Sequence, residues 1–532
     1  MTTVFAAKSA PSSEKLRGGY YTPEPLARFV AAWVAVAGDE LLEPSCGDGE
    51  ILQFLAASGR ATGVELFPLE AAAARERTGA DVFDGDFFSW FAPERHGTFD
   101  GVAGNPPFIR YGSWEEQYRE PAFELMRSEG LSPTRLTNAW LPFVVASVVA
   151  VRDGGRVGLV IPAELLQVGY AAQVRAYLVD QCSEITIVAF RELVFPGVLQ
   201  EVVLLLVTKG NGPASIRTVE VTNGAHLTDV DLDVAAIRAP LHGSEKWTKY
   251  FLDVVQIGLL RDLKNDSRLA RLERYAKVNV GVVTGRNSFF CMTEAEAQRL
   301  GIEEHTLPLL SRSAQFTGVG LTSQDLRSQA ARGAMTRLLA LDPAHDVASD
   351  PSLSRYVRLG LQDGVNDGYK CRIRQSWWSV PSISQPDGFM LRQVSTYLRF
   401  LSNDTGATST DTVHRVFVKP GVDMRRLTVA ALNSATQAMS EVLGRSYGGG
   451  LLEVEPTEAV ALLVPDPELI DEDLMSRVDD LLRNGQIEQA IALVDQRVMI
   501  DRLDFSEAEI GAIREAGYLL RERRLRRGRK ST

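Results

Sequence analysis

Short apolar segments alternate with stretches of helical character over residues 18–210. This alternation is typical of a doubly wound α/β sheet, in which each strand is followed by a helix. Candidate strands occupy residues 155–161, 184–190 and 201–207. The third contains the unbroken aliphatic run 202–207, a pattern that favours a strand buried on both faces.

The second half of the chain follows a different pattern. Residues 211–244 mix Gly, Pro and acidic positions, so we expect a connecting region there. Residues 245–532 contain no internal repeat and are long enough for a domain of their own. The pattern therefore predicts a first domain at 15–210, a connection at 211–244 and a second domain at 245–532.

Carboxylates stand at the ends of three successive candidate strands. Glu43 precedes the loop Ser45-Cys46-Gly47-Asp48-Gly49, Glu65 ends the next strand, and Asp86 follows the third. One such acid alone is typically a helix cap or a solvated loop residue, but three in succession indicate a ligand site. The acids argue against a phosphate ligand. Glu65 follows Gly47 by about 20 residues, where an acid can bind ribose hydroxyls.

The next candidate strand, Phe99–Gly104, leads directly into Asn105-Pro106-Pro107-Phe108. Each proline fixes φ and lacks a backbone N–H, so the loop offers mainly carbonyl oxygens. Such oxygens can accept hydrogen bonds from an exocyclic amino group, and Phe108 provides a flat surface beside them. Taken alone, the tetrapeptide is more typical of a turn beside a core aromatic.

In this order the motifs resemble those of S-adenosylmethionine-dependent DNA adenine-N6 methyltransferases, most closely the gamma-ordered group, in which cofactor motifs precede the recognition domain. The segments that carry the resemblance are 19–23, the Glu43 loop, Glu65, Asp86, 105–108, 154–162 and 194–196. The resemblance implies a Rossmann-like methyltransferase sheet followed by a C-terminal target-recognition domain.

The resemblance also implies a set of cofactor contacts. Thr22 frames the methionine end, Glu43 with the backbone of Ser45 and Gly47 lies along the amino-acid portion, Glu65 binds the ribose hydroxyls, and Asp86 with Phe87 holds adenine. Cys46 is expected to be a buried small residue and not a nucleophile.

Catalysis follows from the chemistry of adenine, whose N6 lone pair is delocalised into the ring. We expect the Asn105 side-chain oxygen and the Pro106 carbonyl to accept hydrogen bonds from N6 and to stabilise its developing charge during direct methyl transfer. The target base must leave the duplex. Phe108 would stack on it, and by resemblance Phe195 covers another side, unless Phe195 is a plain core aromatic.

The net charge of −11 is unusual for a nucleic-acid-binding protein, but local charge decides phosphate contact. Basic and aromatic residues cluster at Arg355, Tyr356, Arg358, Tyr369, Lys370, Arg372, Arg374, Trp377 and Trp378, followed by Arg392, Arg399 and Arg415. The basic tail 521–530 is either a phosphate contact or a disordered solubilising end.

Three glycine-rich or polar segments of the second domain resemble parts of a target-recognition region. They are 280–290, 403–414 and 446–454. The alternative is that they are turns between strands, and His414 alone is more typical of a structural residue.

The four cysteines are scattered, which suits a reducing cytoplasm, and no zinc motif or other metal site is evident. The longest apolar stretch, 140–151, is too short to span a membrane. We expect a cytoplasmic monomer that binds double-stranded DNA.

The expected function is that of a Type II modification enzyme paired with a separate restriction endonuclease, since no nuclease motif is evident near the N-terminus. The length and arrangement resemble the XhoI-like group, which acts on CTCGAG, although no residue encodes that sequence. An RNA or protein-glutamine amino methyltransferase, and a non-catalytic DNA-binding defence subunit, remain alternatives.

Overall fold

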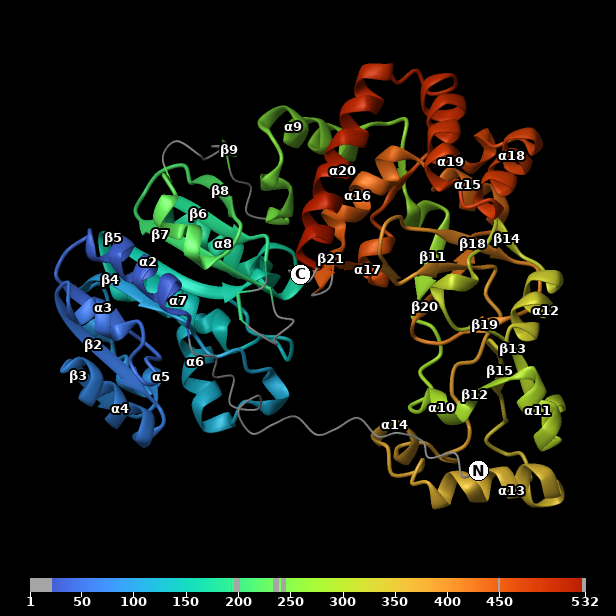
Figure 1. The fold of residues 1–532 in the computed structure, drawn as a ribbon, viewed down its shortest axis with the longest axis horizontal. Helices are drawn as coiled ribbons and strands as arrows, with labels where there is room; N and C mark the ends of the chain where they lie inside the picture. Colours follow the sequence, from blue (N-terminus) through green and yellow to red (C-terminus); the bar gives the residue numbers. More distant parts are fainter. Residues whose placement is uncertain are drawn as a thin grey trace. The chain divides into compact units, whose positions relative to one another are not determined.

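The computed structural model describes residues 22–192, 194–195, 201–232, 239–240, 245–447 and 450–528. The chain divides into two compact units (Figure 1). The sheet unit comprises the described residues within 10–257, 445–450 and 522–532. The C-terminal unit comprises those within 258–444 and 451–521.

A nine-stranded sheet forms the centre of the sheet unit, in the order β3-β2-β1-β4-β5-β7-β6-β8-β9. The strands are β1 (Glu40–Glu43), β2 (Arg60–Glu65), β3 (Asp81–Asp84), β4 (Phe99–Gly104), β5 (Val151–Pro162), β6 (Cys182–Phe190), β7 (Val202–Lys209), β8 (Ser215–Val221) and β9 (Ala239–Pro240). Strands β1 to β5 run parallel. Strand β7 runs antiparallel to both β5 and β6, with Val207 opposite Val157 and Ile185.

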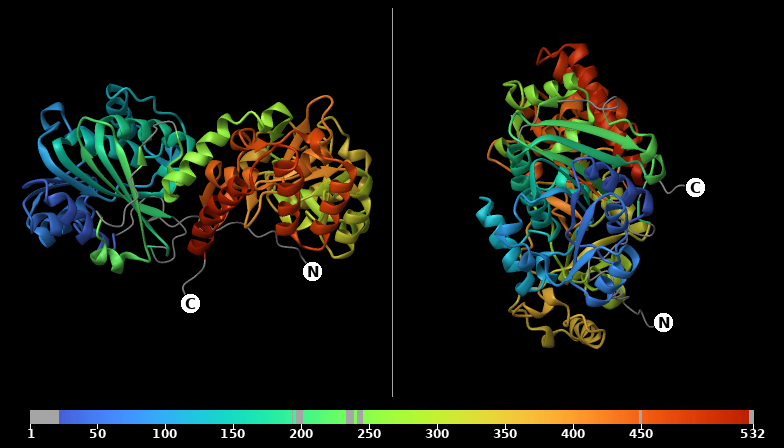
Figure 2. Two further views of the ribbon diagram at one scale, coloured as in Figure 1. Left: turned by 90° about the horizontal axis from the view of Figure 1, so that it is seen from above. Right: turned by 90° about the vertical axis from the view of Figure 1, so that its left-hand side faces the viewer.

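Helices cover the sheet (Figure 2). They are α2 (Glu24–Ala35), α3 (Leu52–Ala56), α4 (Pro68–Thr78), α5 (Phe87–Trp90), α6 (Glu116–Ser128), α7 (Trp140–Ala150) and α8 (Ala172–Gln181). Every residue of α7 is buried, as are the first six residues of β7. Because alternate side chains of a strand point to opposite faces, both faces of β7 are covered.

The order β3-β2-β1-β4-β5-β7-β6 with β7 reversed is that of the S-adenosylmethionine-dependent methyltransferase sheet. The fold class predicted from the apolar pattern is therefore confirmed. In the part of the chain that the structure describes, no helix combines the length and apolar character needed to cross a membrane.

The C-terminal unit is built on small mixed sheets. One has the order β11-β20-β16-β18-β14 and another the order β12-β15-β13-β19. These strands are β11 (Ala276–Asn279), β12 (Cys291–Thr293), β13 (Thr306–Leu310), β14 (Gly320–Leu321), β15 (Met335–Leu339), β16 (Gly388–Leu391), β18 (Phe400–Asn403), β19 (Thr408–Ser409) and β20 (Val413–Val418). Shorter strands are β10 (Ala270–Arg271), β17 (Gln393–Val394), β21 (Arg445–Tyr447), β22 (Leu451–Glu453) and β23 (Leu463–Val464), of which β21 lies in the sheet unit.

Helices surround these sheets in two groups, each with its own apolar core. The first group is α10 (Asn287–Phe290), α11 (Glu294–Leu300), α12 (Ser323–Ala331), α13 (Pro351–Gln362) and α14 (Tyr369–Arg372). The second is α15 (Met424–Ala430), α16 (Ser434–Leu443), α17 (Pro456–Ala459), α18 (Glu472–Arg483), α19 (Ile487–Val494) and α20 (Glu507–Gly528), and α9 (Val254–Asp262) precedes both.

The connecting region predicted at 211–244 differs from the structure. Strand β8 pairs in parallel with β6 along its whole length, and β9 pairs with β8. The boundary between the units falls at 257–258. The prediction was wrong because β8 mixes polar and apolar residues, which made an outer strand resemble a linker.

The basic tail also differs from the predicted solubilising end as far as it is described. Residues 521–528 form the last turns of α20. Arg523 pairs with Glu220 at 2.5 Å and lies over the Phe251 ring. Arg524 is 3% exposed and donates a hydrogen bond to the Gly450 carbonyl. These two arginines therefore stabilise the sheet unit, whereas Arg529 and Lys530 lie outside the described residues.

Arg524→Ala should lower the stability of the sheet unit. It leaves the buried Gly450 carbonyl without this donor, at a cost of about 1–3 kcal/mol, or roughly 2–10 °C in the unfolding midpoint. Differential scanning calorimetry measures the shift, and Arg526→Ala, an exposed position two residues further on, is the control. Equal midpoints for the two variants would contradict the structural role of Arg524.

Candidate functional site

The predicted site residues lie along one edge of the nine-stranded sheet. Parallel strands end together, and ligands of open α/β sheets bind outside their carboxyl ends. Glu43 is the last residue of β1, Glu65 is the last of β2, and Asn105 directly follows β4. The strand register, with Glu43 opposite Gly63 and Leu42 opposite Val102, brings these three ends to the same edge.

Glu43 is a buried acid without a cation. Its side chain is 2% exposed, and Oε2 has no hydrogen-bond partner among the described residues. Burial, and then the negative charge of Glu65, hold the pKa of Glu43 well above its usual range, against a hydrogen bond from the Leu52 backbone that lowers it. A cationic ligand at this position would relieve both unfavourable effects.

Glu65 is held in a fixed orientation by the backbone. Its Oε2 accepts a hydrogen bond from the Gly47 N–H and its Oε1 from the Phe67 N–H, both at 2.9 Å. Gly47 has φ +52°, a left-handed conformation that favours glycine. Burial raises the pKa of Glu65, and these two hydrogen bonds oppose the shift. Each carboxylate oxygen keeps a second lone pair, with which it can accept from a ligand hydroxyl.

Asp86 lies just beyond β3 and begins a short helix. Its Oδ2 accepts hydrogen bonds from the Ser89 N–H at 2.8 Å and the Ser89 hydroxyl at 2.9 Å. Burial raises the pKa of Asp86. Phe87 is 3% exposed and stacks on Phe91 and Phe143, with ring centroids 5.2 and 5.4 Å apart. Its ring therefore belongs to an aromatic cluster in the core.

Two exposed aromatic residues at this edge were not predicted. Phe67 follows Glu65 by two residues and is 41% exposed, and Phe83 lies within β3 and is 43% exposed. Exposed rings beside Glu65 and Asp86 suit the flat face of a heterocycle. Their positions in the sequence, next to acids at strand ends, could have indicated them, because an aromatic residue at such a position does not contribute to the core.

The Asn105 loop connects to two other predicted residues. The Asn105 side-chain Nδ2 donates to the Thr22 hydroxyl at 3.2 Å, and the Ser45 hydroxyl donates to the Asn105 carbonyl at 3.5 Å. Because the amide nitrogen Nδ2 of Asn105 faces Thr22, the amide oxygen Oδ1 points the other way and can act as an acceptor. Pro106 is buried behind the loop. The structure thus brings Thr22, Ser45 and Asn105 together.

Phe108 and Phe195 belong to the same apolar cluster. Phe195 is buried, and Phe108 is partly buried and packs against the cluster that contains it. Residues 19–21 and 196, also part of the predicted motifs, lie outside the described residues.

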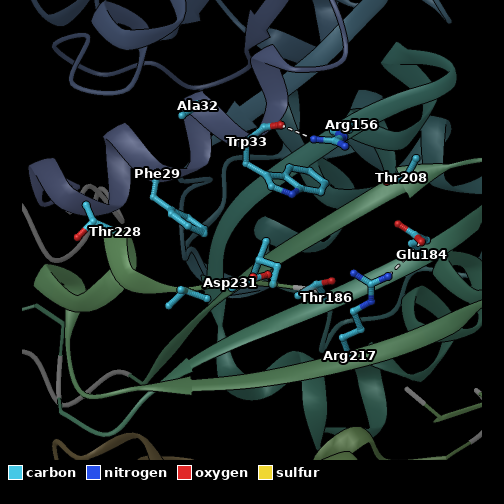
Figure 3. Close-up of a pocket in the computed structure, with 12 residues that line it drawn as sticks. Phe29, Ala32, Trp33, Arg156, Glu184, Thr186, Thr208, Arg217, Thr228 and Asp231 are labelled. Atoms are coloured by element: carbon cyan, nitrogen blue, oxygen red, sulfur yellow. Dashed lines mark hydrogen bonds and ion pairs between the residues drawn. The ribbon is translucent and has the colours of Figure 1, made fainter. Parts of the chain in front are cut away.

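A hollow of about 700 Å³ lies at the opposite ends of the strands (Figure 3). Trp33 of α2 faces the sheet there, and Arg156 donates to the Trp33 carbonyl at 3.1 Å. Arg156 pairs with Gly101 at the start of β4 and with Thr208 near the end of antiparallel β7. The hollow is therefore separate from the edge that carries Glu43, Glu65 and Asn105.

Neither the cysteine at this edge nor the one group of possible metal ligands among the described residues indicates a further catalytic group here. Cys46 is a free, buried thiol whose pKa is raised by burial, as expected for an inert residue. In the C-terminal unit, Glu304, His305 and Asp350 lie within 4.8 Å of one another. Asp350 caps α13 and accepts from His305 at 2.8 Å, which accounts for its position.

The basic residues of the C-terminal unit divide into two sets. The first set binds groups within the fold and comprises Arg374, Arg392, Arg399 and Arg415. Arg374, Arg399 and Arg415 donate hydrogen bonds to the backbone carbonyls of Thr284, Gly318 and Ser382 at 2.8, 2.7 and 2.7 Å, respectively. Arg392 forms ion pairs with Glu453 and Glu455. The second set, Arg355, Arg358, Lys370 and Arg372, is exposed and forms no ion pair with any described residue. The expectation of DNA contact was therefore wrong for the first set, whose hydrogen-bonding capacity is used within the fold.

In the predicted DNA-facing segment 403–414, the structure agrees with the interpretation of His414 as a structural residue. His414 is fully buried, and its Nε2 lies 3.0 Å from the Val454 carbonyl, and burial lowers its pKa to about 4. Segment 446–454 is shared between the units, and its Ser446 exchanges two backbone hydrogen bonds with the Gln167 side chain. Gly448 and Gly449 lie outside the described residues.

S-adenosylmethionine fits the chemistry of the strand-end edge. It carries a sulfonium and an ammonium group, which match the unpaired buried oxygen of Glu43, and ribose hydroxyls, which match the oriented carboxylate of Glu65. The sheet order is that of an S-adenosylmethionine-dependent methyltransferase, and the chemistry of these two acids is compatible with that cofactor.

Known proteins that are similar to this chain indicate which kind of methyltransferase it resembles. Residues 66–195 match the Eco57I restriction-modification methylase family, and residues 244–499 match the C-terminal domain of Type II methyltransferase M.Eco57I. Type II methyltransferase M.AccI of Acinetobacter calcoaceticus is 21% identical over 87% of this chain and 88% of its own. Type II methyltransferase M.XamI of Xanthomonas campestris pv. amaranthicola is 22% identical over 85% of each.

A solved structure, that of the type IIG restriction endonuclease BpuSI, aligns with 96% of this chain and 66% of its own at 13% identity and a TM-score of 0.41. The chain thus spans just under two thirds of that solved protein. The two family models and these relatives together show that the chain is similar to Type II restriction-modification methyltransferases over most of its length.

Glu43→Gln should stabilise the protein in the absence of ligand. A raised folded pKa means that the folded state holds a proton that the unfolded chain has lost, so stability falls as pH rises from about 4.5 through the folded pKa. Gln cannot ionise, so the variant should be more stable than wild type at neutral pH.

Urea unfolding of the two proteins at several pH values between about 5 and 8, above the ordinary pKa of Glu, measures this difference in stability. Glu50→Gln is the control, because Glu50 lies in the same loop but pairs with Arg77 near the surface. A Glu43→Gln protein that is no more stable than wild type at pH 7 would contradict the buried charge.

Glu65→Ala should weaken S-adenosylmethionine binding. Hydrogen bonds to a charged group contribute about 1.5–3 kcal/mol, so we expect a loss of roughly ten- to a hundredfold in affinity. Titration calorimetry measures it, with Glu76→Ala on the exposed side of α4 as the control. Unchanged affinity in the Glu65 variant would remove this residue from the cofactor site.

Proposed function

We propose that the chain is a site-specific DNA adenine-N6 methyltransferase that protects a duplex sequence from a separate restriction endonuclease. The observation that carries the proposal is the Asn105-Pro106-Pro107-Phe108 loop at the end of β4, beside the strand ends of Glu43 and Glu65. A methyl acceptor bound at this loop would lie next to the cofactor edge.

The loop's geometry supports an amino group as the acceptor. The Asn105 Nδ2 donates its hydrogen bond to Thr22, so the Asn105 Oδ1 can accept a hydrogen bond from an exocyclic NH2. The Pro106 carbonyl is the second proposed acceptor. Two hydrogen bonds of this kind withdraw the N6 protons from the ring plane, direct the lone pair outward and stabilise the positive charge that develops on N6.

The remaining steps need positioning more than proton transfer. When bound, S-adenosylmethionine supplies an electrophilic methyl group. Asn105 holds N6 in line with it, and the methylated N6 returns to neutrality by losing a proton to water. The base reaches the loop by leaving the duplex, and Phe108 and Phe195, which share one apolar cluster, would cover its faces.

We assign cofactor binding to the sheet unit and sequence recognition to the C-terminal unit. The M.Eco57I C-terminal family model falls on that second part of the chain, and its exposed cations Arg355, Arg358, Lys370 and Arg372 are suited to phosphate contact. We further propose a cytoplasmic monomer. The sequence CTCGAG is the first target to test, on the resemblance of the arrangement to the XhoI-like group.

Product analysis tests the proposal. The purified chain is incubated with plasmid DNA, total RNA or a protein extract and tritium-labelled S-adenosylmethionine, and each product is digested for mass spectrometry. We expect N6-methyldeoxyadenosine from the DNA alone, at one sequence motif that modified-base sequencing identifies. Label in RNA, in glutamine or on another base would overturn the proposal, as would binding without transfer.

Asn105→Ala should reduce methyl transfer at least about a hundredfold, in the range seen when one donor or acceptor to a developing charge is removed. S-adenosylmethionine affinity should change little, since Glu43 and Glu65 remain. Single-turnover transfer and calorimetry separate the two quantities. An Asn105→Ala protein that keeps near-normal transfer would exclude the assigned catalytic role.

A further inference from the structure

The short helix α14 and the residue after it expose two large apolar side chains to solvent. Tyr369 is 64% exposed and Ile373, directly after the helix, is 60% exposed, whereas Cys371 between them is 1% exposed. Residues four apart share a face of a helix, and a residue midway points to the opposite side. Tyr369 and Ile373 thus form an apolar ridge that faces away from the core that Cys371 enters.

Cations stand on both sides of this ridge. At helical spacing, Lys370 and Arg372 flank Tyr369 and Ile373, and both are exposed without an ion pair to any described residue. The Lys370 ammonium lies 5.7 Å from the centre of the Tyr369 ring. Residues 351–374 carry five Lys or Arg and two Asp, so this segment is positive in a chain whose net charge is −11.

The neighbouring loop holds the ridge in place. Arg374 donates to the Val283 and Thr284 carbonyls at 2.9 and 2.8 Å. Gly285 has φ +83°, and a Cβ there would lie 3.0 Å from the Lys370 Cβ and 3.2 Å from the Cys371 Sγ. The loop thus lies against α14 so closely that glycine is required, and the ridge cannot fold back into the protein.

The ridge lies at one end of the C-terminal unit, where α13 and α14 project (Figures 1 and 2). On α13, Leu353, Tyr356 and Val357 are buried, while Arg355 and Arg358 are exposed. The projecting end therefore presents an apolar ridge with cations beside it.

Duplex DNA matches this pattern. A groove offers apolar base surfaces on its floor and a row of phosphates on each side, and DNA-bending proteins insert apolar wedges between base steps. A helix of one turn is too short for an amphipathic membrane contact, which requires a long apolar face.

We propose that Tyr369 and Ile373 enter a groove of duplex DNA and that Lys370 and Arg372 contact the phosphates on either side. This rests on the proposed function in that the C-terminal unit acts on DNA. The apolar pair gives the contact a component that does not depend on salt, and the cations give one that does.

The salt dependence of binding tests the cations. Binding of the full chain to a fluorescein-labelled duplex of mixed sequence is measured by anisotropy over a range of salt concentrations. Lys370→Gln with Arg372→Gln should lower the slope of log affinity against log salt by about 1.8, or about 0.9 for each phosphate contact. The control is Arg327→Gln on α12 with Arg332→Gln directly after that helix, two exposed cations that form no ion pair with described residues. Equal slopes for the two double variants would overturn the proposal.

Photo-crosslinking tests the ridge. A benzoylphenylalanine in place of Tyr369 should crosslink to the labelled duplex, and the same group in place of Arg327 should not. Both positions are exposed, so the fold is preserved. Absence of a crosslink at position 369, or competition by an acidic protein and not by DNA, would overturn the proposal.

These readouts are independent of methyl transfer. A chain that crosslinks through position 369 but transfers no methyl group contradicts the proposed function alone. A chain that methylates DNA but shows an unchanged salt slope and no crosslink contradicts the DNA-contacting ridge alone.

Discussion

Two carboxylates at adjacent strand ends determine what the sheet unit can bind. Glu43 and Glu65 are both buried, the charge of Glu65 adds to the burial that raises the pKa of Glu43, and Glu43 keeps an oxygen without a partner among the described residues. A buried unpaired charge costs several kcal/mol, so a cationic ligand beside Glu43 would be favourable. The parallel register of β1 and β2 creates this constraint, because it places both strand ends at one edge.

The same edge carries both the proposed cofactor site and the proposed catalytic loop. Strand β4 lies next to β1, so Asn105 follows at the neighbouring strand end, and its hydrogen bonds to Thr22 and Ser45 connect it to the Glu43 loop. Both groups are oriented before any ligand arrives: the Gly47 and Phe67 amides hold Glu65, and the Thr22 hydroxyl binds the Asn105 side chain. Preorganisation of this kind is what electrostatic stabilisation of a transition state requires.

The sequence predicted the buried strands and the strand-end acids well, because strands covered on both faces are runs of apolar residues and packing does not explain an acid at their ends. It failed for β8, whose polar residues resemble those of a linker. It also could not separate Arg415, which donates to backbone carbonyls, from Arg372, which faces solvent. Both lie in polar segments, and only the tertiary fold determines which carbonyls need a donor.

Proton release on cofactor binding tests the carboxylate pair most directly. Calorimetric titration with S-adenosylmethionine at pH 7, repeated in buffers of different ionisation enthalpy, measures the protons released. A positive ligand lowers the raised pKa of Glu43, so wild type should release a proton fraction that Glu43→Gln does not. Equal release by the two proteins, or none by wild type together with full affinity in the variant, would contradict the account.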